Sequence, residues 1–205
     1  MSIPSHKSSP KKARPVQAPQ RSNGKLRVAA ILEAAAAVIA ENGYEGATMA
    51  EIAARSGTKI GSLYRFFPNK ESLADTMVVS AREGLDTAFD KFDAGVRALS
   101  THLLSDGLVT LLIEQVFNRP ALMKLLDASQ DWSVKREEFR AAALRRVIKT
   151  LLIHKPSLPK KSVGDIAIVI LLNTKAMATH RELSDRALSE FRDMTRLYLQ
   201  SRLKS

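Results

Sequence analysis

The sequence predicts an all-α protein with about nine helices, in which an N-terminal three-helix domain of the helix-turn-helix type precedes a larger helical domain. After residue 22, apolar residues recur at the helical spacing of i, i+3 and i+4 almost to the end of the chain. Segments containing glycine and proline interrupt this pattern, and no convincing alternation with a period of two indicates a strand. An apolar fraction of 45% in 205 residues is typical of a globular protein with a real core.

The first 22 residues are predicted to be a disordered basic arm. They are mainly proline, serine, lysine and glutamine, and they bury too little apolar surface to offset the entropy of ordering. Residues 1–27 carry seven cations and no acid, out of a net charge of +11 for the chain. This charge favours a polyanionic partner, usually a nucleic acid; a merely solubilising tail is the alternative.

Several classes of protein are disfavoured by the composition. The longest apolar runs, at 34–40 and 166–172, are far shorter than the roughly 20 residues of a bilayer span, and no apolar signal-peptide segment follows the basic N-terminus. The chain has no cysteine for disulfides or zinc ligation, so a cytoplasmic protein is expected. Four scattered histidines, without a phosphate-binding loop or a serine elbow, predict no cofactor, no metal site and no enzyme.

Residues 48–70 show the pattern of a helix-turn-helix motif. A capping box at residues 48 and 51 starts a first helix, which ends before Gly57. A second helix follows at about 59–66, until Pro68 prevents its continuation. Two helices joined by a short turn containing glycine bind DNA with the second helix in the major groove. The residues of the first helix expected to face inward are Ile52, Ala53 and Ala50.

The second helix and its neighbours supply the candidate DNA contacts. Hydroxyl groups of Thr48 and Tyr64 can donate to phosphates, and Lys70 begins the next helix, where backbone N–H groups also attract phosphate. Residues 55–70 include four cations and no acid, which fits phosphate binding. A core position for Tyr64 and a solvated surface charge at Arg65 are the alternatives. The residues expected against base edges are Lys59, Ile60, Gly61 and Ser62.

Further helices are predicted on both sides of the motif. A helix from about residue 28 ends at Asn42-Gly43, where glycine accepts a left-handed C-cap, and a long helix starts at the cap Asn69. The helix at 163–180 is apolar on every side, so one side can meet the core while the other, with the apolar stripe of 184–202, meets a second subunit. The alternative is a fully internal helix in a monomer. The remaining helices are expected at about 98–117, 121–128 and 133–154.

A series of short motifs with a specific order and spacing lies between Leu26 and Leu73. They are Ala30-Ile31-Leu32-Glu33-Ala34-Ala35, Gly43-Tyr44, Thr48-Met49, Ile52-Ala53, Ser56-Gly57, Gly61-Ser62-Leu63-Tyr64, Phe67 and Lys70-Glu71-Ser72-Leu73. Together they resemble the DNA-binding domain of the tetracycline-repressor (TetR) family of bacterial regulators. The resemblance implies a homodimer with a DNA-binding domain at 23–70 and an effector-binding and dimerisation domain at 71–205. It also implies DNA contacts at Thr48, Lys59, Ile60, Gly61, Ser62, Tyr64, Phe66 and Lys70.

The function implied by the resemblance is sequence-specific regulation of transcription. The expected protein is a repressor, released from a palindromic operator in double-stranded DNA by a small-molecule effector. Residues 98–205 resemble the family only in the number and order of helices, and Gln115 and Trp132 are the candidates there for lining an effector pocket. Phe66 departs from the family pattern, in which histidine or tyrosine is frequent. An effector-independent or architectural DNA-binding protein is the alternative function.

Overall fold

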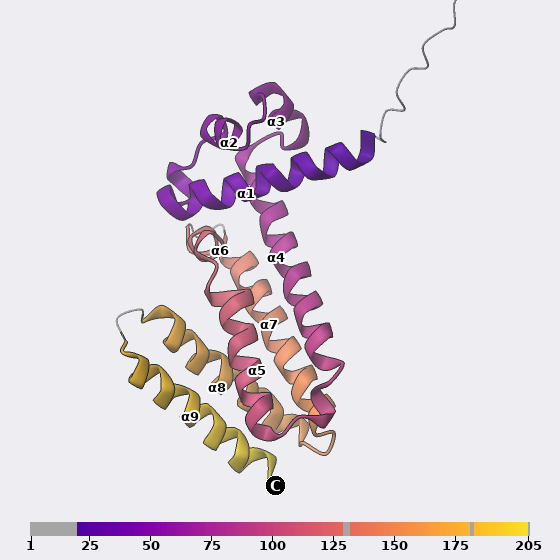
Figure 1. Ribbon diagram of the computed structural model, residues 1–205, viewed down its shortest axis with the longest axis vertical. Helices are drawn as coiled ribbons and strands as arrows, with labels where there is room; N and C mark the ends of the chain where they lie inside the picture. Colours follow the sequence, from indigo (N-terminus) through magenta and orange to yellow (C-terminus); the bar gives the residue numbers. More distant parts are fainter. Residues whose placement is uncertain (1–19, 129–131, 181–182, 205) are drawn as a thin grey trace, which may run out of the picture.

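The computed structural model describes residues 20–128, 132–180 and 183–204, and within these ranges it contains nine α-helices and no strand. The predicted all-α class is therefore confirmed. Three helices, α1 (Gln20–Gly46), α2 (Met49–Arg55) and α3 (Ile60–Phe66), gather at one end of the molecule (Figure 1). The long helix α4 (Lys70–Asp93) leads from them into a larger bundle.

The remaining helices complete the bundle. α5 (Thr101–Leu112) and α7 (Ser133–His154) pack with α4, and the short α6 (Pro120–Leu126) lies directly under α1. α8 (Lys160–Thr179) and α9 (Asp185–Leu203) form a pair on the side away from α4 (Figure 1). A 3₁₀ turn, η1 (Val96–Ala98), precedes α5, and a π-helical turn, η2 (Ile113–Phe117), follows it.

Short-range signals in the sequence set several helix ends. α1 leaves helical geometry at Gly43, whose φ of 75° and ψ of 171° are readily adopted only by glycine. Asn69 caps α4 through its side chain, as predicted. The capping box predicted for α2 is only half formed. Thr48 Oγ1 accepts from the Glu51 N–H at 3.2 Å, but the Glu51 carboxylate accepts from the Asn42 amide at 3.1 Å and so ties α2 to the end of α1.

Two predicted boundaries differ from the structure. The helix expected over 98–117 is divided, because α5 ends at Leu112 and the next five residues form η2, in which the Asn118 N–H donates to the Ile113 carbonyl at 2.6 Å. Wide turns of this kind frequently occur at functional sites. α1 begins at Gln20, so the last three residues of the predicted arm are helical, and the rest of the arm lies outside the described residues.

The buried apolar residues form two clusters. One fills the bundle of α4–α9 and includes Leu85 and Phe89. The other lies among α1, α2, α3 and the start of α4, and it also takes in Ala121 and Leu125 of α6 together with Trp132. α6 therefore contributes to the core of the N-terminal helices, although it is distant from them in sequence. The domain boundary expected at residues 70 and 71 stays a prediction.

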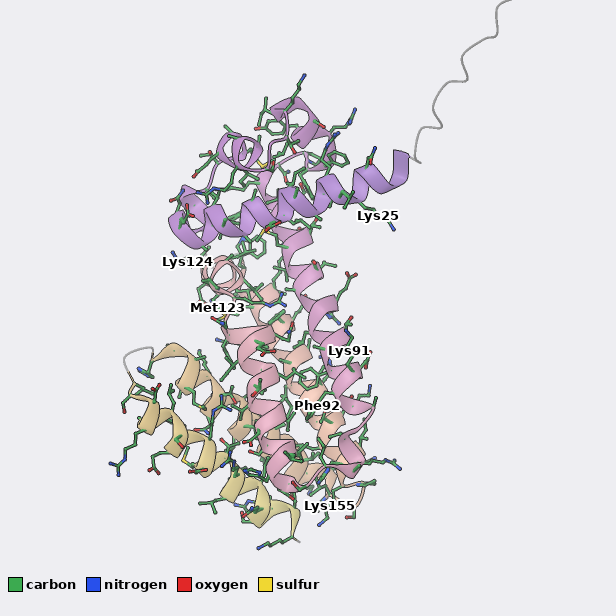
Figure 2. All side chains as sticks on the ribbon, viewed as in Figure 1. Lys25, Lys91, Phe92, Met123, Lys124 and Lys155 are labelled. Carbon is green, nitrogen blue, oxygen red and sulfur yellow. The ribbon has the colours of Figure 1, made fainter. Side chains whose placement is uncertain are left out.

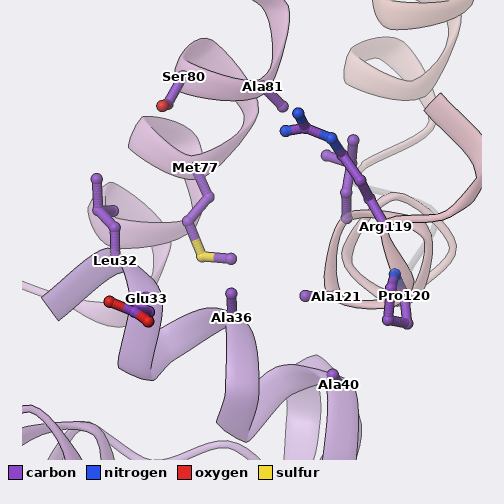
Figure 3. A pocket seen from close by; sticks show the side chains of 11 residues that line it. Leu32, Glu33, Ala36, Ala40, Met77, Ser80, Ala81, Arg119, Pro120 and Ala121 are labelled. Atoms are coloured by element: carbon purple, nitrogen blue, oxygen red, sulfur yellow. The ribbon is translucent and has the colours of Figure 1, made fainter. Parts of the chain in front are cut away.

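Packing around α6 is incomplete on one side. A cavity of about 390 Å³ lies between α1, α4 and α6. Figure 3 shows the small side chains of Ala36 and Ala40 on α1 facing it, with Met77 reaching from α4 and Arg119 from the start of α6. α1 and α6 therefore share a buried core through Ala121 and Leu125, with this cavity beside the contact.

Polar contacts between α4 and α7 centre on Arg146. Its guanidinium donates to the Asp90 carboxylate at 2.6 Å and to Asp93 at 3.2 Å, and the Thr150 hydroxyl donates to Asp93 at 2.6 Å. The side chain of Asp93 is only 7% exposed, so these bonds compensate a buried carboxylate. The network holds the C-terminal half of α4 against α7.

One face of α8 and α9 is apolar and exposed. Leu172 is 63% exposed and Leu197 is 66% exposed, and Ile168, Val169 and Met194 are exposed beside them. α8 was predicted to be apolar on all sides. In the structure one apolar side faces the core, and another is left uncovered by the single chain. By length and composition α8 is also apolar enough to cross a membrane, a test that the core helices of soluble proteins pass equally.

Candidate nucleic-acid interface

α2 and α3 pack as a pair whose apolar residues are directed inward. Met49, Ile52 and Ala53 of α2 and Leu63 of α3 are buried. The expectation that Ala50 faces inward is wrong, since Ala50 is exposed. The buried residues of α2 follow the spacing i, i+3 and i+4 from Met49, which leaves Ala50 outside the buried stripe of this short helix.

The outer surface of α3 brings together four of the eight predicted DNA contacts. Lys59, Ile60, Gly61 and Tyr64 are all exposed, Ile60 by 44% and Tyr64 by 48%. No neighbouring atom lies within 4 Å of the point where Gly61 would carry a Cβ, so its backbone is open to close approach. Thr48, which directly precedes α2, is exposed as well. Because its oxygen accepts from a backbone N–H, its hydroxyl hydrogen is free to donate.

Two of the predicted contacts, Ser62 and Phe66, are turned at least partly into the protein. Ser62 Oγ is buried and has no hydrogen-bond partner among the described residues. Phe66 is half-buried against the core of the N-terminal helices, and the Arg65 guanidinium lies 5.8 Å from its ring centroid. A polar contact from Ser62 to DNA therefore requires rotation of its side chain, and Phe66 offers an apolar surface only.

The cations of the helix-turn-helix motif are not equivalent. Arg55 forms two hydrogen bonds to the Glu41 carboxylate, at 2.8 and 2.9 Å, and these bonds hold the pKa of Glu41 below its ordinary value. Lys59 and Arg65 are exposed, and neither forms an ion pair within the described part of the chain. The positive charge available to phosphates on α3 therefore comes mainly from Lys59 and Arg65.

Lys70 is bonded to the end of α1. Its Nζ donates to the carbonyl oxygens of Tyr44 at 2.8 Å and Glu45 at 3.1 Å, and it lies 4.5 Å from the centroid of the Tyr44 ring. That ring packs edge-on against Trp132, with 5.5 Å between centroids, and burial raises the pKa of Tyr44. A phosphate contact by the Lys70 ammonium would compete with these carbonyls.

Neither residue predicted to line an effector pocket borders the cavities described here. Gln115 Oε1 accepts a hydrogen bond from Arg119 at 2.7 Å, close to Gly84 of α4. Trp132 is 5% exposed and belongs to the core of the N-terminal helices. A helical apolar pattern shows which residues are buried, but it does not distinguish a residue at a cavity wall from one in a packed core.

A contact between distant segments that the sequence reasoning missed is made by Lys124. Its Nζ donates to the carbonyl oxygens of Ala40 at 2.7 Å and Glu41 at 3.4 Å, in the last turn of α1 before Gly43. Figure 2 labels Lys124 and Met123 where α6 meets this end of α1. The sequence signal is a single lysine inside the apolar segment 121–126, which is compatible with many other roles.

The arrangement of α1–α4 defines a helix-turn-helix DNA-binding protein, and comparison with known proteins agrees. Residues 31–77 match the family model described as "Bacterial regulatory proteins, tetR family". This match places a DNA-binding domain of the tetR type at the N-terminal end of the chain, and members of that family are DNA-binding regulators of transcription and generally not enzymes. No functionally curated protein matches the sequence.

Several solved structures share the fold. A transcriptional regulator of the TerR/AcrR family from Aquifex aeolicus VF5 is 21% identical with a TM-score of 0.64, covering 85% of this chain and 98% of its own. A TetR-like regulator from Rhodococcus sp. RHA1 is 18% identical with a TM-score of 0.65, covering 92% and 100%. The fatty acid degradation regulator FadR from Bacillus halodurans is 19% identical with a TM-score of 0.59, covering 83% and 97%. The likeness extends over the C-terminal helices, where the sequence alone matched only in helix number and order.

Proposed function

We propose that the protein is a homodimeric repressor that binds a palindromic operator and is released from it by a small-molecule effector. The observation that carries the proposal is the outer surface of α3, where Lys59, Ile60, Gly61 and Tyr64 are exposed together. In this role Lys59, Ile60 and Gly61 face base edges, while Thr48 and Tyr64 donate to phosphates.

The dimer is proposed to form through the exposed apolar face of α8 and α9. Large exposed apolar patches typically mark interaction surfaces, and this patch is contributed by neighbouring helices. A two-fold dimer would present two copies of α3, and such pairs read half-sites about 34–36 Å apart. The Leu197→Asp substitution should shift the protein from dimer to monomer in sedimentation velocity, and a dimer that survives this change would contradict the proposed interface.

Footprinting of the purified protein on the DNA flanking its own gene tests the proposed repressor. Protection of one short palindrome supports an operator-specific regulator, and diffuse coverage would indicate the alternative architectural protein. The Bacillus halodurans neighbour is a fatty acid degradation regulator, which agrees with a regulatory role.

The proposed contacts are separated by two substitutions on α3. Tyr64→Ala removes a phosphate contact and should weaken binding to all sequences alike, whereas Lys59→Ala should change the preference among operator variants. Identical effects of both substitutions on every site would contradict this assignment.

A further inference from the structure

Two neighbouring cavities lie between η2, α6, α7 and α8. Their volumes are about 430 and 510 Å³, and both are lined by Val116, Phe117, Phe139, Arg140 and Lys175. Val116 and Phe139 are buried, whereas Arg140 and Lys175 are exposed, so an apolar floor is bordered by basic side chains. Cavities of this size accept small organic molecules. The wide turn η2 supplies Val116 and Phe117 to both, in keeping with the frequent placement of π turns at functional sites.

The charges at the rim favour an anionic ligand. Two carboxylates line the cavities, Asp127 in one and Glu137 in the other, and each already faces an arginine. Asp127 lies 3.4 Å from Arg136, and Glu137 lies 3.0 Å from Arg140. The ammonium of Lys175 forms no ion pair within the described ranges, although it borders both cavities. A cationic ligand would therefore meet no unpaired carboxylate here, while an anion would gain the Lys175 ammonium.

Lys124 connects one of these cavities to α1. Its side chain lines the 430 Å³ cavity, and its ammonium donates to the Ala40 and Glu41 carbonyls at the end of α1. Those oxygens carry the partial negative charge of a helix C-terminus. A full anion in the cavity is a stronger acceptor, so it would draw the Lys124 ammonium away from α1.

We propose that this cavity pair binds an anionic amphiphile, meaning an apolar body that ends in a carboxylate, and that Lys124 transmits its binding to α1. The transmission to DNA rests on the proposed function, whereas the ligand class does not. The apolar body lies against Phe117 and Phe139, the carboxylate meets Lys175, and Lys124 turns from α1 toward the ligand.

Isothermal titration of the full chain with three probes tests the ligand class. Decanoate, decanol and decyltrimethylammonium share one chain length and differ in the charge of the head group. Decanoate should bind about tenfold more tightly than decanol, since a hydrogen bond to a charged group is the added interaction. Lys175→Met should reduce this ratio, while Lys161→Met, an exposed lysine at the other end of α8, should preserve it. Equal binding of all three probes, preference for the cation, or an unchanged ratio in Lys175→Met would overturn the proposal.

Fluorescence anisotropy with operator DNA tests the role of Lys124. In the unaltered protein, saturating decanoate should weaken DNA binding by a factor of roughly 5–150, the usual range of coupling between sites. In Lys124→Met, saturating decanoate should change DNA affinity far less, and Lys91→Met, an exposed lysine of α4, should respond like the unaltered protein. A full response in Lys124→Met would overturn the transmission. A protein that binds no operator would instead refute the proposed function, and the titration would still decide the ligand class.

Discussion

Replacing Lys70 with methionine distinguishes a structural role from a phosphate contact. Methionine keeps much of the apolar stem but removes the ammonium that bonds the Tyr44 and Glu45 carbonyls. The bond to Tyr44 is partly buried, and a hydrogen bond from a charged donor contributes about 1.5–3 kcal/mol in such a place. The exposed bond to Glu45 adds little, and the contact with the Tyr44 ring adds about 0.5–1 kcal/mol. We therefore expect Lys70→Met to lower the free energy of unfolding by roughly 2–4 kcal/mol.

Urea denaturation followed by Trp132 fluorescence measures this loss. Trp132 is the only tryptophan of the chain and packs against Tyr44, so its emission reports on the same region. The corresponding decrease in Tm is about 4–16 °C for a protein of this length. Lys91→Met serves as the control and should change stability by less than about 0.5 kcal/mol. If Lys70→Met is as stable as the control yet binds DNA more weakly, Lys70 is a phosphate contact and the structural reasoning is refuted.

Three further changes probe the bundle and the arm. Arg146→Met should cost about 1.5–3 kcal/mol in urea denaturation because the buried Asp93 carboxylate loses a charged donor but keeps Thr150 and Lys149, whereas the exposed Arg145→Met should be nearly neutral. Hydrogen bonds from Arg196, at 2.9 and 3.0 Å, lower the pKa of Asp106 in the folded protein. The stabilising contribution of Asp106 is therefore complete above its unfolded pKa of about 3.9, and it is lost as the pH falls through the lower folded pKa. Asp106→Asn should thus destabilise at neutral pH and reduce the loss of stability below about pH 4. Deletion of residues 1–19, if this basic arm tracks phosphates, should flatten the dependence of DNA affinity on salt, and an unchanged slope would contradict that role.

The N-terminal helices were predictable from sequence because their signals are local. Thr48 and Asn69 are caps that act within one turn, and Gly43 adopts a backbone conformation that other residues avoid. The candidate site was less predictable, because the orientation of a side chain on a seven-residue helix depends on its packing. Ser62 was expected against base edges by its position, yet the structure turns its hydroxyl inward.

Contacts between distant segments could not be predicted at all. The periodic pattern of 121–126 indicates a helix, but nothing in it shows that this helix shares a core with α1. The bonds of Lys124 to α1 span more than 80 residues of sequence. The same limitation explains Trp132, an aromatic residue whose burial was compatible with either a pocket wall or a core.

The free energy of the Lys124 hydrogen bonds limits how far this residue can shift an equilibrium between two conformations. Reversing a two-state equilibrium from 1:99 to 99:1 requires a differential affinity of about 5.5 kcal/mol. Both bonds of Lys124 to α1 are exposed to solvent, so each contributes less than the value of about 1.5–3 kcal/mol that is typical of a charge-assisted hydrogen bond. One Lys124 is therefore insufficient for a complete switch, and even with two copies in a dimer other contacts must supply part of the required value. The movement also has to overcome apolar packing, because Ala121 and Leu125 of α6 share a buried core with α1, while the cavity of about 390 Å³ between α1, α4 and α6 leaves room beside that contact.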